Sequence, residues 1–485
     1  MNVLSLQWLS RSLGLSIAIG LMPAALAQTD NLSLTPAAGG GVVTAKVRAQ
    51  AVDLRDQALA GSKAFDWVES LTTEVGPRLA GTAAEARARD WAVDTLTTLG
   101  FENVRVEPFT MDGWERGLER GAILQPFPQP LTLTALGGSV ATKEAGLSAQ
   151  VQVFESLTAL KRAPEGSLTG KIAYVGHAMR ATQTGSHYGY FGALRRVGAS
   201  IAASKGALGL LIRSIGTDSH RMPHTGSMRY DDAQPKIPAA ALSNPDADQI
   251  ERIASRGQPI EIHMTLTPRF TGKVSSGNVI AEIVGTDYPE EIVMMGGHLD
   301  AWDLGTGAID DGAGVAITLE SARLIKASGL RPKRTIRLIF WGAEEVGLLG
   351  GYDYVRRYQA SLTQHVAATE SDFGAGKIWQ ITSRVSTEGK AVVDVIAELV
   401  EPLGVAPGAT DVAAAGPDLT PMIAAGMPGF RFVQDGSDYF DLHHTADDTL
   451  DKIEPGNMDQ NVAAYVVFAW IAANASVSDW GWQTP

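Results

Sequence analysis

Cysteine is absent from the 485-residue sequence, and this absence excludes several features at once. Without thiols the chain cannot form disulfide bonds, carry a lipid on a lipoprotein cysteine, or build a structural zinc site from cysteine ligands. Its stability must therefore come from a hydrophobic core. The length and the 45% share of hydrophobic residues are ample for such a core, in two or three domains.

Long apolar segments are also scarce. The segment Leu13–Leu21 is too short to cross a bilayer comfortably, and no later stretch qualifies. It follows Arg11 and precedes Ala25-Leu26-Ala27, a small-residue pattern typical of signal-peptidase sites. We therefore predict a signal peptide at residues 1–27, cleaved after Ala27, and a secreted or periplasmic protein without a membrane span. Residues 28–45 are polar and glycine-rich and are expected to be a disordered lead-in.

Basic residues are outnumbered by acidic ones. The 40 lysines and arginines against 53 aspartates and glutamates give a formal charge of −13. This balance argues against nucleic acid or an anionic membrane as a partner. Several of the acids gather in the motifs described next, so the net charge says nothing about the charge of a substrate.

Three short motifs lie between residues 296 and 345: G-G-H-L-D, G-A-I-D-D-G-A-G and W-G-A-E-E. The first follows an apolar strand at 292–295, and the third follows an alternating strand at 335–341. The second is expected to open a helix with Asp310 and Asp311, because apolar residues then recur at helical spacing as far as Ser328. In open α/β sheets the functional site lies outside the carboxyl ends of the strands. The three motifs are therefore expected to meet at one sheet edge.

Two further motifs lie downstream. A-T-E-S-D-F-G at 368–374 follows a strand and offers Asp372, and H-H-T-A-D-D-T at 443–449 offers a pair of histidines. A lone histidine or acidic pair is usually structural or solvated, but five such motifs near strand ends favour a single site. Histidine and carboxylates without any thiol suit a hydrated catalytic metal centre.

These motifs resemble those of the carboxypeptidase Q family, which belongs to the co-catalytic di-zinc exopeptidases of the aminopeptidase and glutamate carboxypeptidase group. The resemblance covers residues 64–473. It implies an α/β fold with a mixed, mostly parallel sheet flanked by helices, and two Zn²⁺ per subunit. It also implies an exported enzyme that hydrolyses peptide bonds of dipeptides or short peptides by a metal-activated water.

The resemblance carries residue roles over motif by motif. Asp310 resembles the carboxylate that bridges both metals, Glu344 the general base, and Asp300 the carboxylate that orients the first histidine. The family pattern favours His444 over His443 as a ligand, because the histidine directly precedes Ser or Thr. The Asp310–Asp311 peptide is expected to be cis. The implied metal ligands are His298, Asp310, Glu345, Asp372 and His444.

The domain organisation follows from a change in the predicted secondary-structure pattern near Trp114. From there short alternating segments appear, and this part resembles a β-rich protease-associated domain inserted at 114–268 into a catalytic domain formed by 46–113 and 269–485. Within the insert, His224 and Arg221 lie in a loop that is expected to contact the substrate, with an exposed loop as the alternative. Asp418 resembles a position that borders the substrate pocket, although it could equally cap a helix.

Three other functions compete with this one. An aminopeptidase with the same di-zinc core stays open, because the sequence does not indicate which peptide terminus is recognised. A non-catalytic, receptor-like protein on this fold is disfavoured because such relatives lose metal ligands, whereas this chain keeps all of them. A glutaminyl cyclase shares the fold but lacks the inserted domain. A peptide is the expected partner, and the dimers common among relatives leave a homodimer open.

Overall fold

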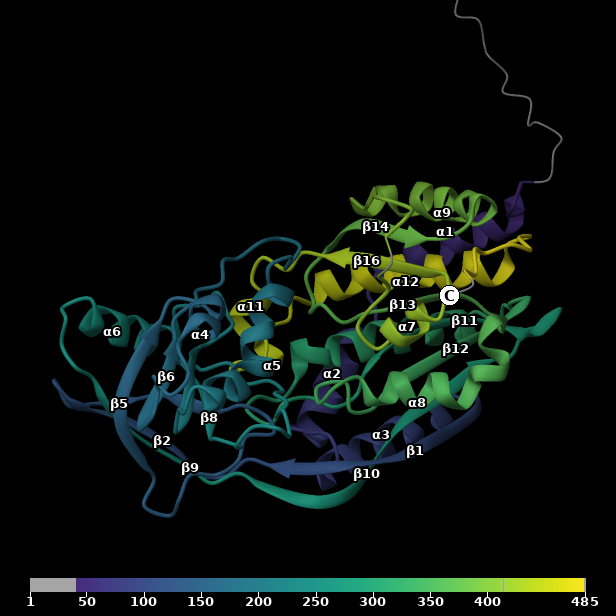
Figure 1. The fold of residues 1–485 in the computed structure, drawn as a ribbon. Coiled ribbons are helices and arrows are strands. Elements are labelled where there is room, and N and C mark those ends of the chain that lie inside the picture. Colours follow the sequence, from purple (N-terminus) through teal and green to yellow (C-terminus); the bar gives the residue numbers. More distant parts are fainter. Residues whose placement is uncertain (1–40, 413, 484–485) are drawn as a thin grey trace, which may run out of the picture. The chain divides into compact units, whose positions relative to one another are not determined.

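Two large β-sheets organise the residues that the computed structural model describes, 41–412 and 414–483 (Figure 1). These residues belong to one compact unit. The predicted signal peptide and most of the predicted lead-in lie outside the described residues. No helix in the described ranges combines the length and the apolar character needed to cross a membrane.

The first sheet has five strands in the order β1-β10-β12-β11-β13. Its strands are β1 (Glu102–Glu115), β10 (Arg269–Ile283), β11 (Tyr288–His298), β12 (Arg334–Trp341) and β13 (His365–Glu370). The pairs β12–β11 and β11–β13 are parallel, whereas β1–β10 and β10–β12 are antiparallel. The sheet is therefore mixed, but the expected majority of parallel pairs is not confirmed. The difference arises because β10 pairs back along β1 before the sheet continues into its parallel half.

Both faces of this sheet are covered, which explains why β12 is buried along its whole length. Alternate residues of β11 point to opposite faces. Val293 and Met295 join the core formed with α7 and α12, while Ile292 and Met294 join a second core with α8 and α10. The helices of this part are α1 (Ala45–Leu59), α2 (Ala64–Glu74), α3 (Ala83–Thr98), α7 (Ala313–Ala327), α8 (Leu349–Tyr358), α9 (Thr387–Val400), α10 (Thr420–Ala424), α11 (Tyr439–Leu442) and α12 (Pro455–Asn474).

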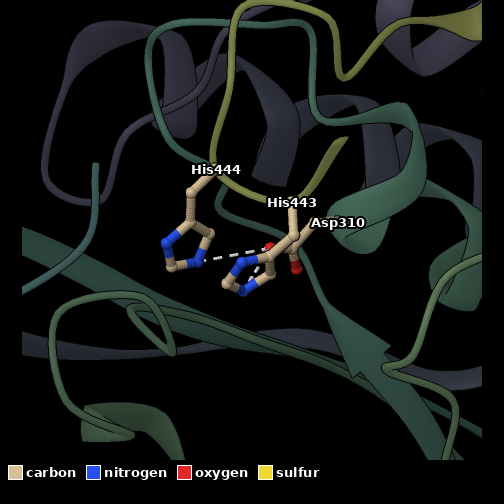
Figure 2. Close-up of side chains that lie close together, drawn as sticks. All are labelled: Asp310, His443 and His444. Carbon is tan, nitrogen blue, oxygen red and sulfur yellow. Dashed lines mark ion pairs between the residues drawn. The ribbon is translucent and has the colours of Figure 1, made fainter. Parts of the chain in front are cut away.

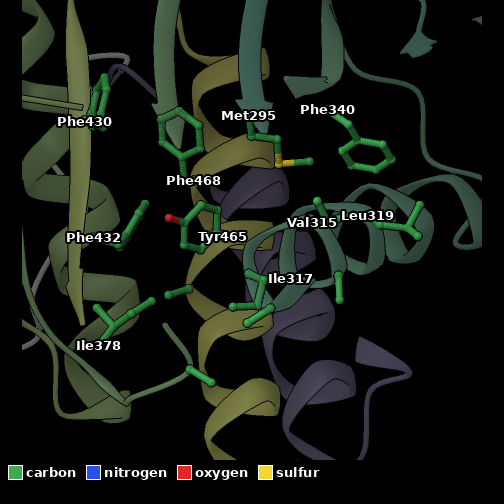
Figure 3. Close-up of a cluster of buried hydrophobic side chains, with 14 of the residues drawn as sticks. Met295, Val315, Ile317, Leu319, Phe340, Ile378, Phe430, Phe432, Tyr465 and Phe468 are labelled. Carbon is green, nitrogen blue, oxygen red and sulfur yellow. The ribbon is translucent and has the colours of Figure 1, made fainter. Parts of the chain in front are cut away.

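The closing helix α12 lies at the centre of the larger core (Figure 3). Its Tyr465 and Phe468 pack against Phe432 and Phe430, with ring centroids 4.9 and 5.0 Å apart. The two phenylalanines belong to a small third sheet, with strands β14 (Ile378–Arg384), β15 (Ala406–Pro407) and β16 (Gly429–Gln434). Aromatic pairs of this kind contribute about 0.5–1.5 kcal/mol beyond the area they bury. The closing helix therefore fixes β16, which follows α10 and leads towards the histidine motif.

The second large sheet is formed by the part of the chain that lies between β1 and β10 in the sequence. It has eight strands, of which β5, β6, β7 and β8 are parallel neighbours. Its strands are β2 (Glu119–Gln125), β3 (Gln129–Leu131), β4 (Leu133–Ala135), β5 (Leu147–Phe154), β6 (Lys171–Val175), β7 (Gly209–Arg213), β8 (Ala239–Leu242) and β9 (Glu261–Leu266). Helices α4 (Leu157–Arg162), α5 (Tyr188–Ser204) and α6 (Asn244–Ala254) accompany it. This segment is rich in strands, while its identity as a protease-associated domain stays a prediction.

Candidate metal centre and substrate cavity

The predicted motifs meet at the edge formed by the carboxyl ends of β11, β12 and β13. The register places His298 beside Trp341 and Gly296 beside Glu370, so the three strands end at the same level. Gly297 is required there because a Cβ atom would lie 2.5 Å from the Asp311 carboxylate and 2.8 Å from the backbone of α7. The glycine thus lets the start of the helix approach the strand end, and brings Asp310 and Asp311 next to His298.

Asp310 and Asp311 do not open the helix as expected. Both have non-helical backbone angles in an irregular turn, η1 (Ala308–Gly312), and α7 begins only at Ala313. The peptide between them is cis, as predicted. The carboxylate of Asp448 accepts the backbone N–H groups of Ile309 and Asp310 at 2.6 and 3.2 Å. The turn is therefore held from outside rather than by helical hydrogen bonds.

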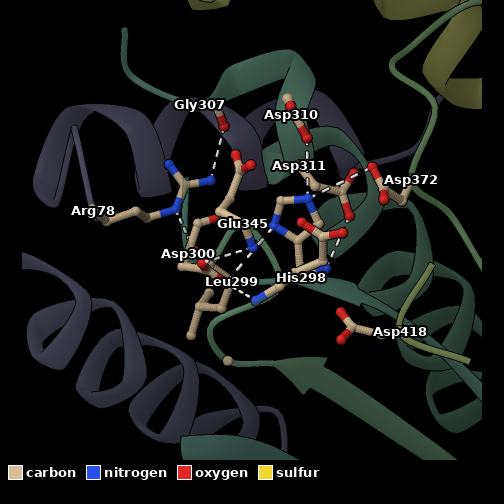
Figure 4. Close-up of polar contacts among 12 residues, drawn as sticks. Arg78, His298, Leu299, Asp300, Gly307, Asp310, Asp311, Glu345, Asp372 and Asp418 are labelled. Atoms are coloured by element: carbon tan, nitrogen blue, oxygen red, sulfur yellow. Dashed lines mark hydrogen bonds and ion pairs between the residues drawn. The ribbon is translucent and has the colours of Figure 1, made fainter. Parts of the chain in front are cut away.

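A fully buried arginine holds the loop that leads into this turn. The guanidinium of Arg78 donates to the carbonyl oxygens of Leu299, Thr306 and Gly307 at 2.5, 2.6 and 2.8 Å (Figure 4). Burial lowers the pKa of Arg78, although nearby aspartates, Asp448 foremost, oppose this shift. Arg78 belongs to the turn G-P-R-L-A-G, which precedes α3. It joins that turn to the loop between His298 and Asp310.

His298 lies between two sets of oxygen atoms. Its Nδ1 is 2.8 Å from the backbone carbonyl oxygen of Asp300, and its Nε2 is 3.0 Å from Asp310 Oδ1 and 3.6 Å from Asp372 Oδ1. Because a carbonyl oxygen only accepts hydrogen bonds, Nδ1 carries the proton of a neutral ring, and the Nε2 lone pair faces the two carboxylates.

The carboxylate of Asp300 has a different partner from the one expected. It lies 3.9 Å from His298 Nδ1 and instead accepts the backbone N–H groups of Glu344 and Glu345 at 3.0 and 3.3 Å. The short separation between residues 298 and 300 brings the backbone carbonyl, not the side chain, to the ring. Asp300 thus connects the loop after β11 to the loop after β12.

His443 and His444 both face Asp310 (Figure 2), at the carboxylate oxygen that His298 does not contact. Their Nε2 atoms lie 3.5 and 3.4 Å from Asp310 Oδ2, and the two rings stack with centroids 3.5 Å apart. Only His444 also reaches Glu345, at 3.0 Å from Nε2 to Oε2. This contact favours His444 over His443 as the ligand, as predicted from the motif, while the assignment itself stays a prediction.

This arrangement fits bound cations. Three sets of donor atoms lie close enough to share an ion, and two of them contain Asp310: Asp310, His443 and His444; His298, Asp310 and Glu345; His298, Asp311 and Asp372. Asp310 Oδ2, Glu345 Oε1 and His443 Nδ1 are buried without a hydrogen-bond partner among the described residues. Lone pairs of imidazole nitrogen and carboxylate oxygen repel one another unless a cation or a proton lies between them.

Burial dominates the electrostatics of the site. It raises the pKa values of Glu344 and Glu345 well above their usual range, and neighbouring acids such as Asp372 and Asp310 add to the shift. Burial lowers the pKa values of His443 and His444, helped by Arg195. For His298, burial alone would lower the pKa, but Asp372, Asp310 and Glu344 together raise it well above the usual value.

Further acidic residues lie around the predicted set. Asp311 is fully buried and accepts the backbone N–H groups of His298 and Gly314, both at 3.0 Å. Glu370 accepts the N–H of Asp418 at 2.9 Å, and neither oxygen of the fully buried Asp418 carboxylate has a partner among the described residues. Figure 4 shows the Asp418 side chain apart from the cluster, with its carboxylate towards it. Asp311 could have been recognised from its place beside Asp310, whereas Glu370 had no pattern of its own.

A cavity of about 840 Å³ opens over these residues. Acids and histidines line one part of it: Asp310, Glu344, Glu345, Glu370, Asp372, His443 and His444. Four arginines also line it: Arg195, Arg196, Arg229 and Arg431. None of the four was identified from the sequence, because an isolated arginine carries no positional pattern. The cavity is large enough for a short peptide.

The three predicted substrate residues do not belong to the described lining of this cavity. Arg221 is half-exposed and pairs with Asp246 at 3.0 Å. His224 is buried, and both of its ring nitrogens are bonded, to Asp218 and to the carbonyl of His443. Asp418 is buried behind the wall, while its neighbours Pro417 and Thr420 line the cavity.

Comparisons with known proteins identify the family of this chain. Residues 278–469 match the family model Peptidase family M28. Carboxypeptidase Q of Mus musculus is 34% identical over 413 residues, which cover 85% of this chain and 86% of that protein. Carboxypeptidase Q of Homo sapiens is 34% identical over 417 residues, with 86% of each chain covered.

Solved structures agree as well. The crystal structure of a Peptidase M28 precursor from Shewanella amazonensis is 48% identical, with a TM-score of 0.89 and coverage of 91% of this chain and 99% of that one. A zinc aminopeptidase from Bacillus subtilis shares the fold, with a TM-score of 0.61, 22% identity and coverage of 85% and 97%. The resemblance seen in the motifs is thereby confirmed. The chain belongs to peptidase family M28 and is a metallopeptidase related to carboxypeptidase Q.

Proposed function

We propose that this metallopeptidase is an exported exopeptidase with two zinc ions, which hydrolyses dipeptides and short peptides that have a free carboxyl terminus. The observation that carries the proposal is the composition of the cavity. Candidate metal ligands and Glu344 line one part of it, and another part is lined by arginines that form no ion pair with an acidic residue in the described part of the chain.

The two oxygens of Asp310 support a pair of ions. Oδ1 faces His298 and Oδ2 faces His444, so the two oxygens of one carboxylate lie next to two different groups of candidate ligands. His298 and Asp372 would hold one ion, and His444 and Glu345 the other, with Asp310 shared. Zinc ions bound there would lower the pKa of a water molecule and polarise the peptide carbonyl.

Glu344 is the proposed general base. It is half-buried in the cavity wall, and its backbone N–H is held by the Asp300 carboxylate. Its carboxylate would accept a proton from the attacking water and deliver it to the leaving amine nitrogen. A raised pKa suits both steps, because the carboxyl group can then hold the proton between them.

The arginines support recognition of a carboxylate. Arg431 on β16 lies with its guanidinium carbon 5.8 Å from the Phe373 ring, and it has no hydrogen-bond or ion-pair partner among the described residues. Arg195 on α5 is buried and donates to Tyr188 Oη at 2.7 Å, while its Nε has no partner there. Partly desolvated guanidinium groups bind carboxylates by charge-assisted hydrogen bonds. A free peptide carboxyl terminus is the carboxylate that every unmodified substrate would bring.

The segment 114–268 is proposed as a protease-associated domain that walls this cavity, because α5 supplies Arg195 and Arg196 to the lining. Residues 1–27 remain a proposed signal peptide. A homodimer also remains a proposal.

Metal analysis combined with a substrate profile tests the proposal. Purified protein should contain two zinc ions per chain and should hydrolyse free and N-blocked dipeptides. It should hydrolyse aminoacyl amides poorly, because they lack the carboxylate. Fast turnover of amides together with inert N-blocked dipeptides would indicate an aminopeptidase instead.

A further inference from the structure

The loop between β7 and β8 reaches the histidine motif from the other large sheet. Its His224 is 2% exposed, and Nδ1 lies 2.6 Å from the backbone carbonyl oxygen of His443. On the opposite side of the ring, Nε2 lies 2.5 Å from Asp218 Oδ2. The ring passes close to Gly216, where a Cβ atom would collide with it. His224 therefore bridges its own loop and the residue that precedes His444.

The chemistry of the two contacts determines the role of each ring nitrogen of His224. A carbonyl oxygen only accepts hydrogen bonds, so Nδ1 donates to His443. Asp218 is itself held, because its Oδ1 accepts the N–H of His220 at 2.7 Å. The Asp218 carboxylate on the other nitrogen therefore fixes the orientation of the ring.

The backbone that receives this bond is strained. His444 has φ of 64°, in the left-handed region that non-glycine residues seldom adopt. Such a conformation persists only where the surroundings hold it. The carbonyl before it is held by His224, and the carbonyl of His444 itself accepts the N–H of Thr225 at 3.0 Å. Thr225 also places its own carbonyl oxygen 3.2 Å from His444 Nδ1.

We propose that His224 is a positioning residue of the metal centre, which sets the backbone of His443 and His444 so that His444 Nε2 faces Glu345 and Asp310. The inference rests on the proposed function, since it assigns His444 and Glu345 to one ion. It gives the loop 216–228 a role in metal affinity in place of the substrate contact expected from the sequence. The ion assigned to His298 and Asp372 has no such support from this loop.

Two amide substitutions separate the two bonds of the ring. The side-chain nitrogen of asparagine can take the place of Nδ1, whereas that of glutamine takes the place of Nε2. His224→Asn thus keeps a donor for the His443 carbonyl, and His224→Gln keeps only the contact with Asp218. The matched control is His220→Ala, which removes an exposed histidine of the same loop.

The experiment measures zinc transfer from the full-length mature holoenzyme to a chromophoric chelator, together with the thermal midpoint of the metal-depleted protein. In His224→Gln, one of the two ions should be bound about 10- to 100-fold more weakly, the range typical for lost partners of ligand residues. The second ion and the thermal midpoint should match the parent protein. His224→Asn and His220→Ala should both retain the parent's two affinities.

Any other result of this experiment overturns either the proposed function or the inference about His224. If the parent protein holds no zinc, the proposed function fails and the inference fails with it. If the parent holds two ions and His224→Gln matches it, only the inference is overturned. An equal weakening of both ions with a lower thermal midpoint would show a merely structural residue. Should His224→Gln not fold, Asp218→Asn retains the histidine but weakens the bond that orients its ring. The same ion should then be bound more weakly, and unchanged zinc transfer in that variant would overturn the inference.

Discussion

The backbone carbonyl oxygen of Asp300 lies 2.8 Å from His298 Nδ1, while the carboxylate of the same residue lies 3.9 Å away and binds the N–H groups of Glu344 and Glu345. Asp300→Asn should therefore leave the histidine oriented but disturb the loop that carries Glu344. One amide nitrogen would then face an N–H donor. We expect kcat to fall by about 10²-fold, the cost of a misplaced catalytic group, while the zinc content stays near that of the parent. Loss of zinc with unchanged kcat per bound metal would contradict this. Asp287→Asn, at an exposed position just before β11, is the control and should keep the parent's kcat.

Glu344→Gln tests the general base directly. A carboxamide cannot accept the proton of the attacking water, so turnover should fall by about 10²–10⁴-fold. Zinc content and the circular dichroism spectrum should not change. The exposed Glu290→Gln is a matched control. Near-normal turnover with full zinc content would show that another group acts as the base.

Zinc-to-protein ratios of two alanine variants show which of the stacked histidines, His443 or His444, is a metal ligand. His444→Ala removes a nitrogen that faces both Glu345 and Asp310, so about one ion per chain should be lost. His443→Ala removes a nitrogen that faces Asp310 alone, and should mainly disturb packing against Tyr188 and Phe440. The opposite order of zinc ratios would reverse the ligand assignment.

Arg78→Lys should destabilise the protein although it preserves the charge. An ammonium group cannot reach three carbonyl oxygens in the planar arrangement that the guanidinium uses. A hydrogen bond to a charged group contributes about 1.5–3 kcal/mol, so the loss of even one should lower the free energy of unfolding by that amount. Urea unfolding of the metal-depleted protein measures it. Arg87→Lys, at an exposed position of α3, should have little effect.

Stability should fall in acid because of His365. Burial lowers its pKa to about 4, and Arg337 adds to the shift. Its Nδ1 donates to the Leu362 carbonyl, and its Nε2 accepts from Tyr354 Oη at 2.6 Å, so the folded protein holds a neutral ring. In the unfolded chain the histidine has its ordinary pKa of 6.5 and therefore binds the proton first as the pH falls. Stability present above pH 6.5 is therefore lost towards pH 4, by about 3 kcal/mol.

The comparison is with His365→Gln, whose amide oxygen can accept from Tyr354. The free energy of unfolding is measured by urea titration at several pH values for both proteins. Between about pH 6.5 and 4 the variant should lose about 3 kcal/mol less than the parent. Parallel curves for the two proteins would show that His365 does not contribute to the acid sensitivity.

Much of the site could be predicted because its motifs are local. The end of an apolar strand can be recognised in the sequence, because the apolar residues stop there. A histidine or carboxylate that follows a parallel strand lies at the same sheet edge as the residues that follow the neighbouring strands. The motifs around His298, Glu345 and Asp372 follow the parallel strands β11, β12 and β13 in this way. Asp310 and His444 were assigned through the family resemblance, because His444 follows α11 and the antiparallel strand β16. The predicted start of α7 is two residues too early, because an apolar repeat cannot reveal the irregular turn that holds Asp310 and Asp311.

The contacts that could not be predicted act over long separations. Arg78 bonds to carbonyl oxygens more than 220 residues away, and His224 bonds to one 219 residues away. The residues that flank an arginine or a loop histidine do not indicate which distant carbonyl oxygen its side chain will bond to. The pairing of β10 with β1 likewise depends on where the chain returns after the second large sheet, so the share of parallel strands could not be read from hydrophobic patterns.

The bond between His224 and His443 also bears on when this protease can become active. The residues around Asp310 come from strands in the middle of the chain, and the histidine motif follows more than 130 residues later. A chain that is still being made lacks the histidine motif, which contains the last of the proposed ligands, and its bond to His224. Metal capture is thus coupled to complete folding, since the ligands converge only then. The peptidase therefore remains latent for as long as it is a nascent chain.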